Sequence, residues 1–284
     1  MPVQAIADQT ARRQEHPTLI AHPDVHGVRV FHDNYIWILA NQGQALVVDP
    51  GEAAPVQAAL HRLHLDLAGI LITHHHSDHV DGVPALTRSR FVPVYGPETE
   101  KGAIRGITHT IGHGETISIC GVSCEVIGVP GHTLEHVAYV VPSSPAILFC
   151  GDALFSAGCG RILEGTPAQM HRSLQALGAL PGSTLVYCGH EYTAANIQFA
   201  LEVEPGNREL ERYAARVRSL RSAGLPTLPA GLEAEKSINP FLRTSVPAVR
   251  ASAERRAGRS LESETEVLAI LREWKDGFGG TGRL

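Results

Sequence analysis

Short apolar runs recur along residues 27–190, and glycine, proline and aspartate separate them. The clearest runs are YIWILA, ALVV, GILI, CEVIGV, HVAYVV and AILFC. Runs of this length that are rich in Val, Ile, Tyr and Phe and bounded by turn residues predict β-strands. Most connections are too short for a crossover helix, so hairpins and meanders should dominate. The pattern therefore predicts two β-sheets packed together with a few helices outside them, and not a doubly wound parallel sheet.

Two segments inside this β-rich stretch have helical spacing instead, residues 53–65 and 166–180. The second begins with several N-terminal signals. Thr166 suits the N-cap, Pro167 suits the first helical position, and Gln169 can complete a capping box. These two segments supply helices expected on the outside of the sheets.

The pattern changes after residue 190, where helical periodicity becomes dominant. Residues 207–224 and 263–278 show it, and Ser263 with Glu266 forms a second capping-box signature. This C-terminal part also holds 14 of the 24 basic residues. The sequence therefore predicts three parts, which are an N-terminal extension (1–26), a β-rich domain (27–190) and a helical C-terminal domain (191–284).

Composition places the chain among ordinary globular proteins. The 284 residues include 43% hydrophobic and 19% charged residues, which is typical of a folded domain. The formal net charge is −5 at pH 7, from 24 basic and 29 acidic side chains. A chain without a basic excess is a poor candidate for binding nucleic-acid phosphates. We therefore expect no nucleic-acid partner.

Cysteine usage and hydropathy bear on the compartment. The five cysteines include no CxxC pair, which suits neither a disulfide framework nor a thiolate zinc knuckle. The first residues lack the apolar run of a secretory signal, and no stretch approaches the roughly 20 apolar residues of a membrane span. We therefore expect a cytoplasmic protein that does not bind a membrane. We also expect a monomer, although these features do not bear on the oligomeric state.

The 16 histidines are unevenly distributed, since none follows His190. The densest stretch is THHHSDHVDG (73–82), directly after the apolar run GILI. Four histidines and one aspartate within seven residues are hard to justify by packing, because unpaired imidazoles would be desolvated and repel one another when protonated. A metal site at this strand end explains them better.

The spacing within the stretch allows two ligand sets. In an extended backbone His74 and His76 point to the same side. Asp78 and His79 follow at the turn and can converge from another direction. Imidazole nitrogens and a carboxylate, with no thiolate, are donors that zinc, iron(II) and manganese accept.

Three later positions repeat the arrangement of a strand that ends in glycine next to a metal-competent side chain. They are His132 in VPGHT, Asp152 in FCGD and His190 in YCGH. Glycine lets the backbone turn sharply at such positions. Together with the first stretch, these residues suffice for two metals that share a bridging carboxylate.

These motifs resemble a known family. THHHSDH, VPGHT, FCGD and YCGHEYT, in this order, resemble the motif set of the metallo-β-lactamase superfamily. Residues 151–166 and 186–207 are similar to the hydroxyacylglutathione hydrolase (glyoxalase II) branch, and 238–243 with 271–278 fit the C-terminal domain of that branch. The resemblance implies an α+β fold, an αββα four-layer sandwich of the metallo-β-lactamase type with a C-terminal helical domain.

The resemblance also implies a ligand assignment. One metal would be held by His74, His76 and His132, the other by Asp78, His79 and His190, with Asp152 bridging them. Asp78 and Asp152 would also be catalytic. Zinc is the first expectation, with iron and manganese as alternatives. A hydroxide bridging the metals would attack a thioester carbonyl.

The substrate implied is S-D-lactoylglutathione, hydrolysed to D-lactate and glutathione, a step of methylglyoxal detoxification. The positions that contact glutathione in the family are occupied here by Arg161, Tyr192, Arg272 and Lys275. Leu163 departs from the pattern, because some relatives have a tyrosine that can donate a hydrogen bond. His75 and His136 have no assigned role.

Two alternatives have to be weighed. A glutathione persulfide dioxygenase of the same superfamily uses one iron and would need neither a full second ligand set nor the long helical domain. A non-catalytic metal- or thiol-binding protein of the same fold would be expected to lack some motif positions. This chain lacks none, so the hydrolase remains the preferred interpretation.

Overall fold

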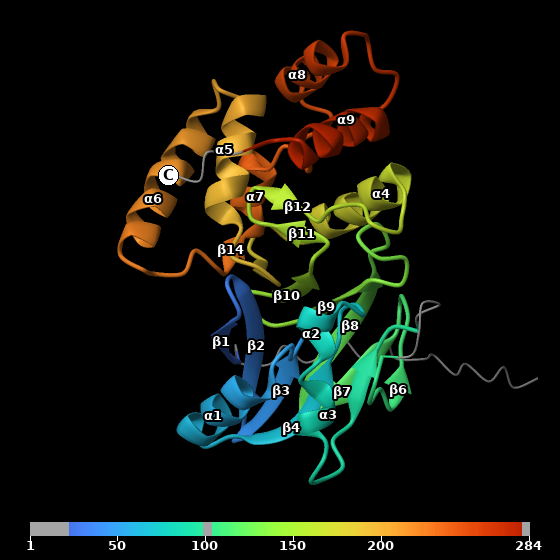
Figure 1. The fold of residues 1–284 in the computed structure, drawn as a ribbon, viewed down its shortest axis with the longest axis vertical. Helices are drawn as coiled ribbons and strands as arrows, with labels where there is room; N and C mark the ends of the chain where they lie inside the picture. Colours follow the sequence, from blue (N-terminus) through green and yellow to red (C-terminus); the bar gives the residue numbers. More distant parts are fainter. Residues whose placement is uncertain (1–22, 99–103, 280–284) are drawn as a thin grey trace, which may run out of the picture.

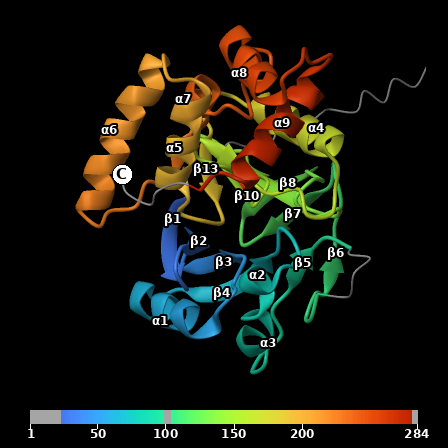
Figure 2. The ribbon, with the colours of Figure 1, turned by 45° about the horizontal axis from the view of Figure 1, so that its top comes forward.

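Two β-sheets lie face to face, with helices on both outer sides (Figures 1 and 2). The structure is a computed structural model that describes residues 23–98 and 104–279, so most of the expected N-terminal extension (1–26) lies outside the described residues. The first sheet consists of β1 (Asp24–Val30), β2 (Asn34–Asn41), β3 (Gln44–Val48), β4 (Asp66–Leu71), β5 (Val94–Gly96) and β6 (His109–Thr110), in that spatial order.

The second sheet has the spatial order β14-β13-β10-β9-β8-β7, and a small hairpin lies beside it. Its strands are β7 (Thr116–Ile119), β8 (Val122–Gly128), β9 (Val137–Val141), β10 (Ile147–Gly151), β13 (Leu185–Cys188) and β14 (Ala230–Gly231). The hairpin pairs β11 (Leu154–Phe155) with β12 (Gly158–Cys159). The helices are α1 (Ala53–Leu63), α2 (Ser77–Val80), α3 (Val83–Leu86), α4 (Pro167–Gly178), α5 (Thr193–Val203), α6 (Arg208–Ser222), α7 (Leu232–Ile238), α8 (Pro247–Ala257) and α9 (Glu264–Asp276).

Strand β2 shows how the layers form, because it is buried on both faces. Tyr35, Trp37 and Leu39 face the second sheet and belong to the core between the sheets. Ile36 and Ile38 alternate with them and pack with the buried residues of α1 and α3 on the other face. Successive side chains point to opposite faces of a strand, so alternate residues of β2 belong to the two cores on either side of it. The four-layer αββα architecture is confirmed.

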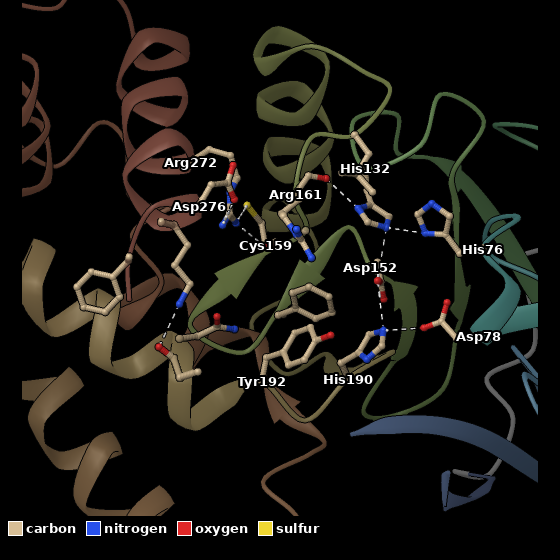
Figure 3. A pocket seen from close by; sticks show the side chains of 17 residues that line it. His76, Asp78, His132, Asp152, Cys159, Arg161, His190, Tyr192, Arg272 and Asp276 are labelled. Carbon is tan, nitrogen blue, oxygen red and sulfur yellow. Dashed lines mark hydrogen bonds and ion pairs between the residues drawn. The ribbon is translucent and has the colours of Figure 1, made fainter. Parts of the chain in front are cut away.

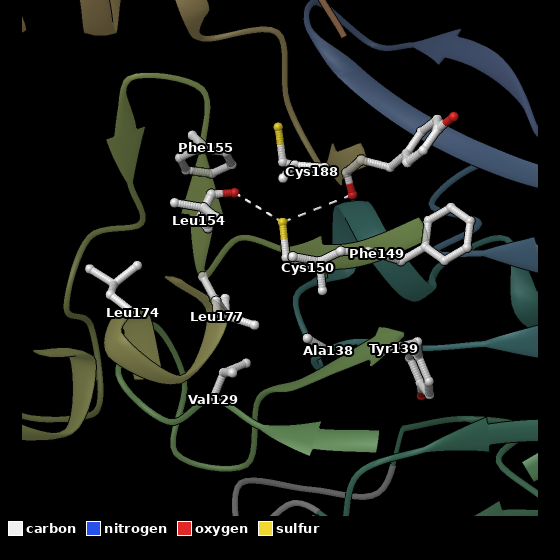
Figure 4. Packing of buried hydrophobic residues seen from close by; sticks show 14 of the residues in the cluster. Val129, Ala138, Tyr139, Phe149, Cys150, Leu154, Phe155, Leu174, Leu177 and Cys188 are labelled. Carbon is white, nitrogen blue, oxygen red and sulfur yellow. Dashed lines mark hydrogen bonds between the residues drawn. The ribbon is translucent and has the colours of Figure 1, made fainter. Parts of the chain in front are cut away.

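The outer layer over the second sheet is built by the later helices. Cys150 on β10 lies in one apolar cluster with Leu154 on β11 and with Leu174 and Leu177 on α4 (Figure 4). The Cys150 thiol is fully buried and donates a hydrogen bond to the Leu154 carbonyl oxygen. Burial raises the pKa of this thiol well above its usual range. It acts as a small apolar core residue.

The strand pairing differs in part from the expectation. Hairpins and meanders do connect β1 to β3 and β7 to β10, but β3, β4, β5 and β6 pair in parallel. Parallel neighbours require a crossover, and α1 provides it between β3 and β4. The prediction that hairpins dominate is therefore wrong for this half of the first sheet and for β10 and β13 of the second sheet, which also pair in parallel.

Both capping predictions can be checked in detail. Thr166 and Gln169 form the complete capping box at α4, each side chain bonding to the other residue's backbone N–H. At α9, the Ser263 hydroxyl accepts from the Glu266 N–H, as predicted. The Glu266 carboxylate, however, accepts from the Glu262 N–H rather than from Ser263. The second box is therefore only half formed.

The C-terminal segment also extends the second sheet. Strand β14 pairs antiparallel with β13, with Leu185 opposite Gly231. In Figure 1, α5, α6 and α7 lie beside this end of the sheet, on the opposite side of the molecule from α1. Among the described residues, 23–98 and 104–279, no helix is long and apolar enough to cross a membrane.

A buried carboxylate joins α7 to the hairpin. Glu235 is fully buried and accepts hydrogen bonds from the Ser156 hydroxyl, the Ala157 N–H and the Asn239 side-chain amide. Burial disfavours the charged form and raises the pKa of Glu235 to about 7, although these hydrogen bonds act against the shift. The carboxyl group is therefore held near its titration point at neutral pH.

This raised pKa makes stability depend on pH. Between the ordinary pKa of a glutamate and about 7, the folded state binds a proton that the unfolded state has lost, so the free energy of unfolding falls as pH rises. Between pH 5 and pH 8 it should fall by roughly 2 kcal/mol more than in Glu235→Gln. Urea titrations at several pH values measure this difference. The exposed Glu233→Gln on the same helix is the control, and parallel curves for all three proteins would contradict the prediction.

Candidate active site

The predicted ligands meet where strands of both sheets end. His74 and His76 follow β4, Asp152 follows β10 and His190 follows β13. His132 comes from the loop after β8. Figure 3 shows His76, His132, Asp152, Asp78 and His190 turned toward one another at one end of a pocket. All seven residues predicted as ligands converge here: six of them form two groups of three, and Asp152 lies between these groups. Asp49 also lies close to His74 and His79.

The first group consists of three histidines. The Nδ1 atom of His76 lies 3.1 Å from His74 Nε2 and 3.1 Å from His132 Nε2. His74 and His132 are buried, whereas His76 is partly open to the pocket. Three imidazole nitrogens therefore face a common point, as the spacing of His74 and His76 predicted.

The second group combines one carboxylate with two histidines. Asp78 Oδ2 lies 3.5 Å from both His79 Nε2 and His190 Nε2. Asp152 stands between the two groups, with Oδ1 3.6 Å from His79 Nε2 and Oδ2 3.3 Å from His190 Nε2. The same Oδ2 is 3.5 Å from His132 Nε2 of the first group. A single carboxylate thus faces both groups.

Hydrogen bonds on the outer side of the rings determine which nitrogen carries the proton. His79 Nδ1 donates to Asp49 Oδ2 at 3.0 Å, and His190 Nδ1 donates to Asp33 Oδ1 at 2.8 Å. His132 Nδ1 donates to the Arg161 carbonyl oxygen at 2.8 Å. Since these nitrogens hold the protons of the neutral rings, the inward-facing Nε2 atoms present lone pairs.

These lone pairs face carboxylate oxygens, and that arrangement tests whether metal ions fit. The buried atoms His79 Nε2 and Asp152 Oδ1 have no hydrogen-bond partner. Buried polar atoms are rarely left unsatisfied, and a lone pair opposite a carboxylate oxygen is repulsive unless a cation lies between them. The nitrogen and oxygen donors suit a divalent metal. The site therefore fits divalent metal ions.

The pKa values of these side chains also indicate a site that attracts positive charge. Burial alone would lower the pKa of His79, but the nearby carboxylates, Asp152 foremost, raise it to about 9. Burial alone would raise the pKa of Asp152, but His79 and His190 hold it well below its usual range. In the first group, burial and His132 lower the pKa of His76 to about 4. The carboxylates of the second group thus attract a positive charge, either a proton on His79 or a cation, whereas the first group keeps its imidazoles neutral.

Several contributing residues were not identified from the sequence. Asp33, Asn34 and Asp49 hold ligands from outside, and each lies at a strand end next to a turn. Their position at strand ends was the signal that the sequence offered. The ligands that they contact, however, lie 30 to 157 residues away along the chain. His136 accepts a hydrogen bond from the Asp152 N–H at 3.1 Å, and His75 pairs with Glu164 at 3.2 Å.

Five of the seven predicted ligands line one end of a cavity of about 450 Å³, namely His76, Asp78, His132, Asp152 and His190. The hairpin β11–β12 lines it, and α9 closes the far end, where Figure 3 shows Arg272 and Asp276. The cavity is lined by all four residues predicted to contact substrate, namely Arg161, Tyr192, Arg272 and Lys275. Leu163 also lines it and is 54% exposed. The structure thus brings the two predicted sets of residues together in one cavity.

The two cationic side chains on α9 differ in how many of their N–H donors are already used within the protein. Arg272 is buried, donates to the Cys159 carbonyl oxygen at 2.8 Å and pairs with Asp276 at 2.9 Å. Lys275 Nζ donates to the Ala195 carbonyl oxygen, and burial, reinforced by Arg272, lowers its pKa to about 8. Arg272 therefore has few donors left for a ligand, whereas Lys275 makes a single hydrogen bond through one of its three donors.

Tyr192 connects the cavity to the ligand groups. Its ring stacks on His190 with centroids 4.7 Å apart and an interplanar angle of 6°. Phe155 of β11 packs edge-on against both rings. This stack lies between the convergent histidines and α9, so a ligand that spans the cavity would pass along it.

This combination of fold and site defines a class. The family described as "Metallo-beta-lactamase superfamily" matches residues 29–190, and the chain belongs to that superfamily. The family described as "Hydroxyacylglutathione hydrolase C-terminus" matches residues 191–278. A protein named hydroxyacylglutathione hydrolase from Nitrosomonas eutropha is 48% identical over 257 residues, which are 90% of this chain and 99% of that protein. Within the superfamily, the chain belongs to the hydroxyacylglutathione hydrolases.

Solved structures agree with the fold. The crystal structure of BLEG-1 B3 metallo-beta-lactamase matches with a TM-score of 0.59 at 21% identity, covering 77% of this chain and 99% of that one. The crystal structure of TTHA1623 in a di-iron-bound form matches with a TM-score of 0.50 at 27% identity, covering 58% of this chain and 92% of that one. The second of these proteins thus holds two irons on a related fold.

Metal binding should stabilise the folded chain. At a free metal concentration 100 times the dissociation constant, one ion adds about 2.7 kcal/mol to the free energy of unfolding, or roughly 5–10 °C in Tm for a chain of this size. Thermal melts of chelator-treated protein with and without Zn²⁺ measure it. His132→Gln should lose much of the rise, whereas the exposed His61→Gln on α1 should keep it. An unchanged Tm on adding zinc, iron(II) or manganese would contradict the metal site.

Proposed function

We propose that this protein is a metal-dependent thioester hydrolase that converts S-D-lactoylglutathione to D-lactate and glutathione. The observation that carries the proposal is the cavity, which has convergent metal ligands at one end and Arg272 and Lys275 at the other. The relatives named hydroxyacylglutathione hydrolase support this substrate class.

The proposed ligand assignment follows the two groups. His74, His76 and His132 would hold one ion, Asp78, His79 and His190 the other, and Asp152 would face both. We propose zinc as the metal, with iron and manganese as alternatives that the donor set accepts equally. When bound, divalent ions at such a site polarise a carbonyl oxygen and lower the pKa of a water molecule toward neutrality.

Asp78 and Asp152 have complementary parts in the proposed reaction. The low pKa of Asp152, which His79 and His190 maintain against the effect of burial, keeps this carboxylate ionised at neutral pH. Asp78 is more exposed and lines the cavity, so its free oxygen can accept a hydrogen bond from an attacking water. The leaving thiolate needs little general-acid assistance, because thiols have pKa values near 8.5.

The helical segment would bind the peptide part of the substrate. Glutathione carries two carboxylates, and Lys275 and Arg161 offer cations along the cavity. Tyr192 offers an aromatic face and a hydroxyl. We propose that residues 191–284 act as the substrate-binding domain for residues 27–190. We also propose that the protein is a monomer in the cytoplasm, where its five free cysteines would stay reduced.

A one-iron persulfide dioxygenase is the alternative within the superfamily. The second ligand group distinguishes the two proposals, because the ligand atoms of Asp78, His79 and His190 lie within 4.8 Å of one another, as those of the first group do. A one-metal enzyme would have no use for a second group in which every ligand is held by its own hydrogen bond. We therefore prefer the hydrolase.

Hydrolysis of S-D-lactoylglutathione by metal-loaded protein is the direct test. We expect turnover, and Asp152→Ala should reduce kcat/KM by roughly 10²- to 10³-fold because it removes the carboxylate that faces both groups. Loss of thioester absorbance and metal content are measured together. Two bound ions without turnover would reject the substrate assignment, and oxygen consumption with glutathione persulfide would favour the alternative.

The two cations should respond differently to substitution. Lys275→Ala should lower kcat/KM by roughly 10- to 100-fold, since a charged hydrogen bond contributes about 1.5–3 kcal/mol, while metal content stays unchanged and Tm falls no more than in the control Lys236→Ala. Arg272→Ala should also lower Tm, because Arg272 links α9 to β12. Lys236→Ala is a matched control, since its Nζ also donates to a backbone carbonyl oxygen but lies away from the cavity. Kinetics of Lys275→Ala equal to those of the control would contradict the role of Lys275.

A further inference from the structure

The turn between β1 and β2 lies against only one of the two ligand groups. Its backbone is joined to the chain around His190, since the Glu191 N–H donates to the Asp33 carbonyl oxygen and the Tyr35 N–H donates to the Gly189 carbonyl oxygen. Asn34 and His190 also form an isolated β-bridge. The turn is therefore fixed relative to this one ligand by main-chain hydrogen bonds.

The side chains of this turn contact two ligands of the second group. Asp33 Oδ1 accepts from His190 Nδ1 at 2.8 Å, and the Asn34 amide nitrogen donates to Asp78 Oδ2 at 2.8 Å. That same Oδ2 is the oxygen that faces His79 Nε2 and His190 Nε2. Asn34 thus fixes Oδ2 as the carboxylate oxygen of Asp78 that faces the other ligands. Asp33 fixes Nε2 as the nitrogen of His190 that faces them.

Two ligands of the first group are oriented by residues outside the β1–β2 turn. His132 donates to the Arg161 carbonyl oxygen, and His74 Nδ1 lies 2.9 Å from the Thr73 hydroxyl, which itself donates to Asp49. Neither of these contacts involves the β1–β2 turn. The β1–β2 turn therefore supports the second group alone, whereas Asp49 links the two groups, since its Oδ2 accepts from both Thr73 and His79.

We propose that Asp33 and Asn34 are positioning residues that strengthen metal binding by the Asp78, His79 and His190 group without acting on the other group. The proposal rests on the ligand assignment made above. A carboxylate that accepts from a ligating histidine raises the basicity of its other nitrogen and restrains the ring, and an amide hydrogen bond restrains a ligating carboxylate. Removing such a partner weakens metal binding by about 10- to 100-fold.

The test counts bound ions during competition with a chelator. Wild-type protein, Asp33→Ala and Asn34→Ala are loaded with zinc, dialysed against increasing chelator concentrations, and analysed for metal per chain. We expect one of the two ions to be lost at a roughly 10- to 100-fold lower chelator concentration in both variants, while the other ion is retained as in the wild type.

Asn41→Ala is the matched control. Asn41 lies at the other end of β2 and also donates one 2.8 Å hydrogen bond, to the Cys120 carbonyl oxygen, but contacts no ligand. Its metal loss should follow the wild type, and the Tm values of the metal-free proteins should be similar. If Asp33→Ala does not fold, Asp33→Asn keeps an acceptor without the charge and should weaken the same ion to a smaller extent.

The outcomes separate this inference from the proposed function. Equal weakening of both ions, or no change in either variant, would overturn the inference. A wild-type protein that binds fewer than two ions would overturn the ligand assignment and the inference with it. Selective loss of one ion in a protein that does not hydrolyse the thioester would support the inference and reject only the function.

Discussion

A buried negative charge is the constraint on which the site depends. Asp152 is 7% exposed, and its oxygens face His79, His132 and His190 at 3.3–3.6 Å. An isolated carboxylate in such surroundings would be strongly destabilising, so its neighbours must supply positive charge. A proton on His79 can supply it, since the carboxylates raise the pKa of this imidazole to about 9, and so can divalent cations between the rings and the carboxylate. The architecture of both sheets serves to bring these groups to one point.

Close approach of the backbone is part of that requirement. A side chain at Gly189 would place a Cβ atom 2.6 Å from Asp152 Oδ1 and 2.8 Å from His79. Gly151, with φ of +47°, turns the chain at the end of β10, directly before Asp152. The glycines before the ligands, which predicted sharp turns, thus also provide space where two strand ends meet.

The ligands could be predicted from the sequence because the information is local. His74, His76, Asp78 and His79 follow one another at a strand end, and the later ligands repeat a strand–glycine–ligand pattern. The supporting contacts could not be predicted in this way. Asp33 bonds to a histidine 157 residues away, and Glu235 bonds to a backbone amide 78 residues away. Only the assembled fold defines such pairs.

Strand pairing and the availability of the cationic side chains also depend on the assembled fold. Nothing in the apolar runs distinguishes a parallel neighbour from an antiparallel one, so the parallel half of the first sheet was missed. The family resemblance predicted that Arg272 and Lys275 contact the substrate, but it could not show that Arg272 is held by Cys159 and Asp276. Which cation remains available to a ligand depends on tertiary contacts.

Strand β14 has a consequence for how this chain can evolve. It comes from the C-terminal segment, yet it covers the edge of β13 in the second sheet. A sheet edge left unpaired is a template for association with other chains. Glu191, which follows His190, accepts from the Tyr35 hydroxyl of β2 and from the Thr227 N–H, and so joins the same two segments. Replacing the C-terminal segment by an unrelated one would therefore expose the edge of β13 and loosen the chain around His190 at the same time. Substitutions in the two segments must for this reason remain compatible with each other during evolution.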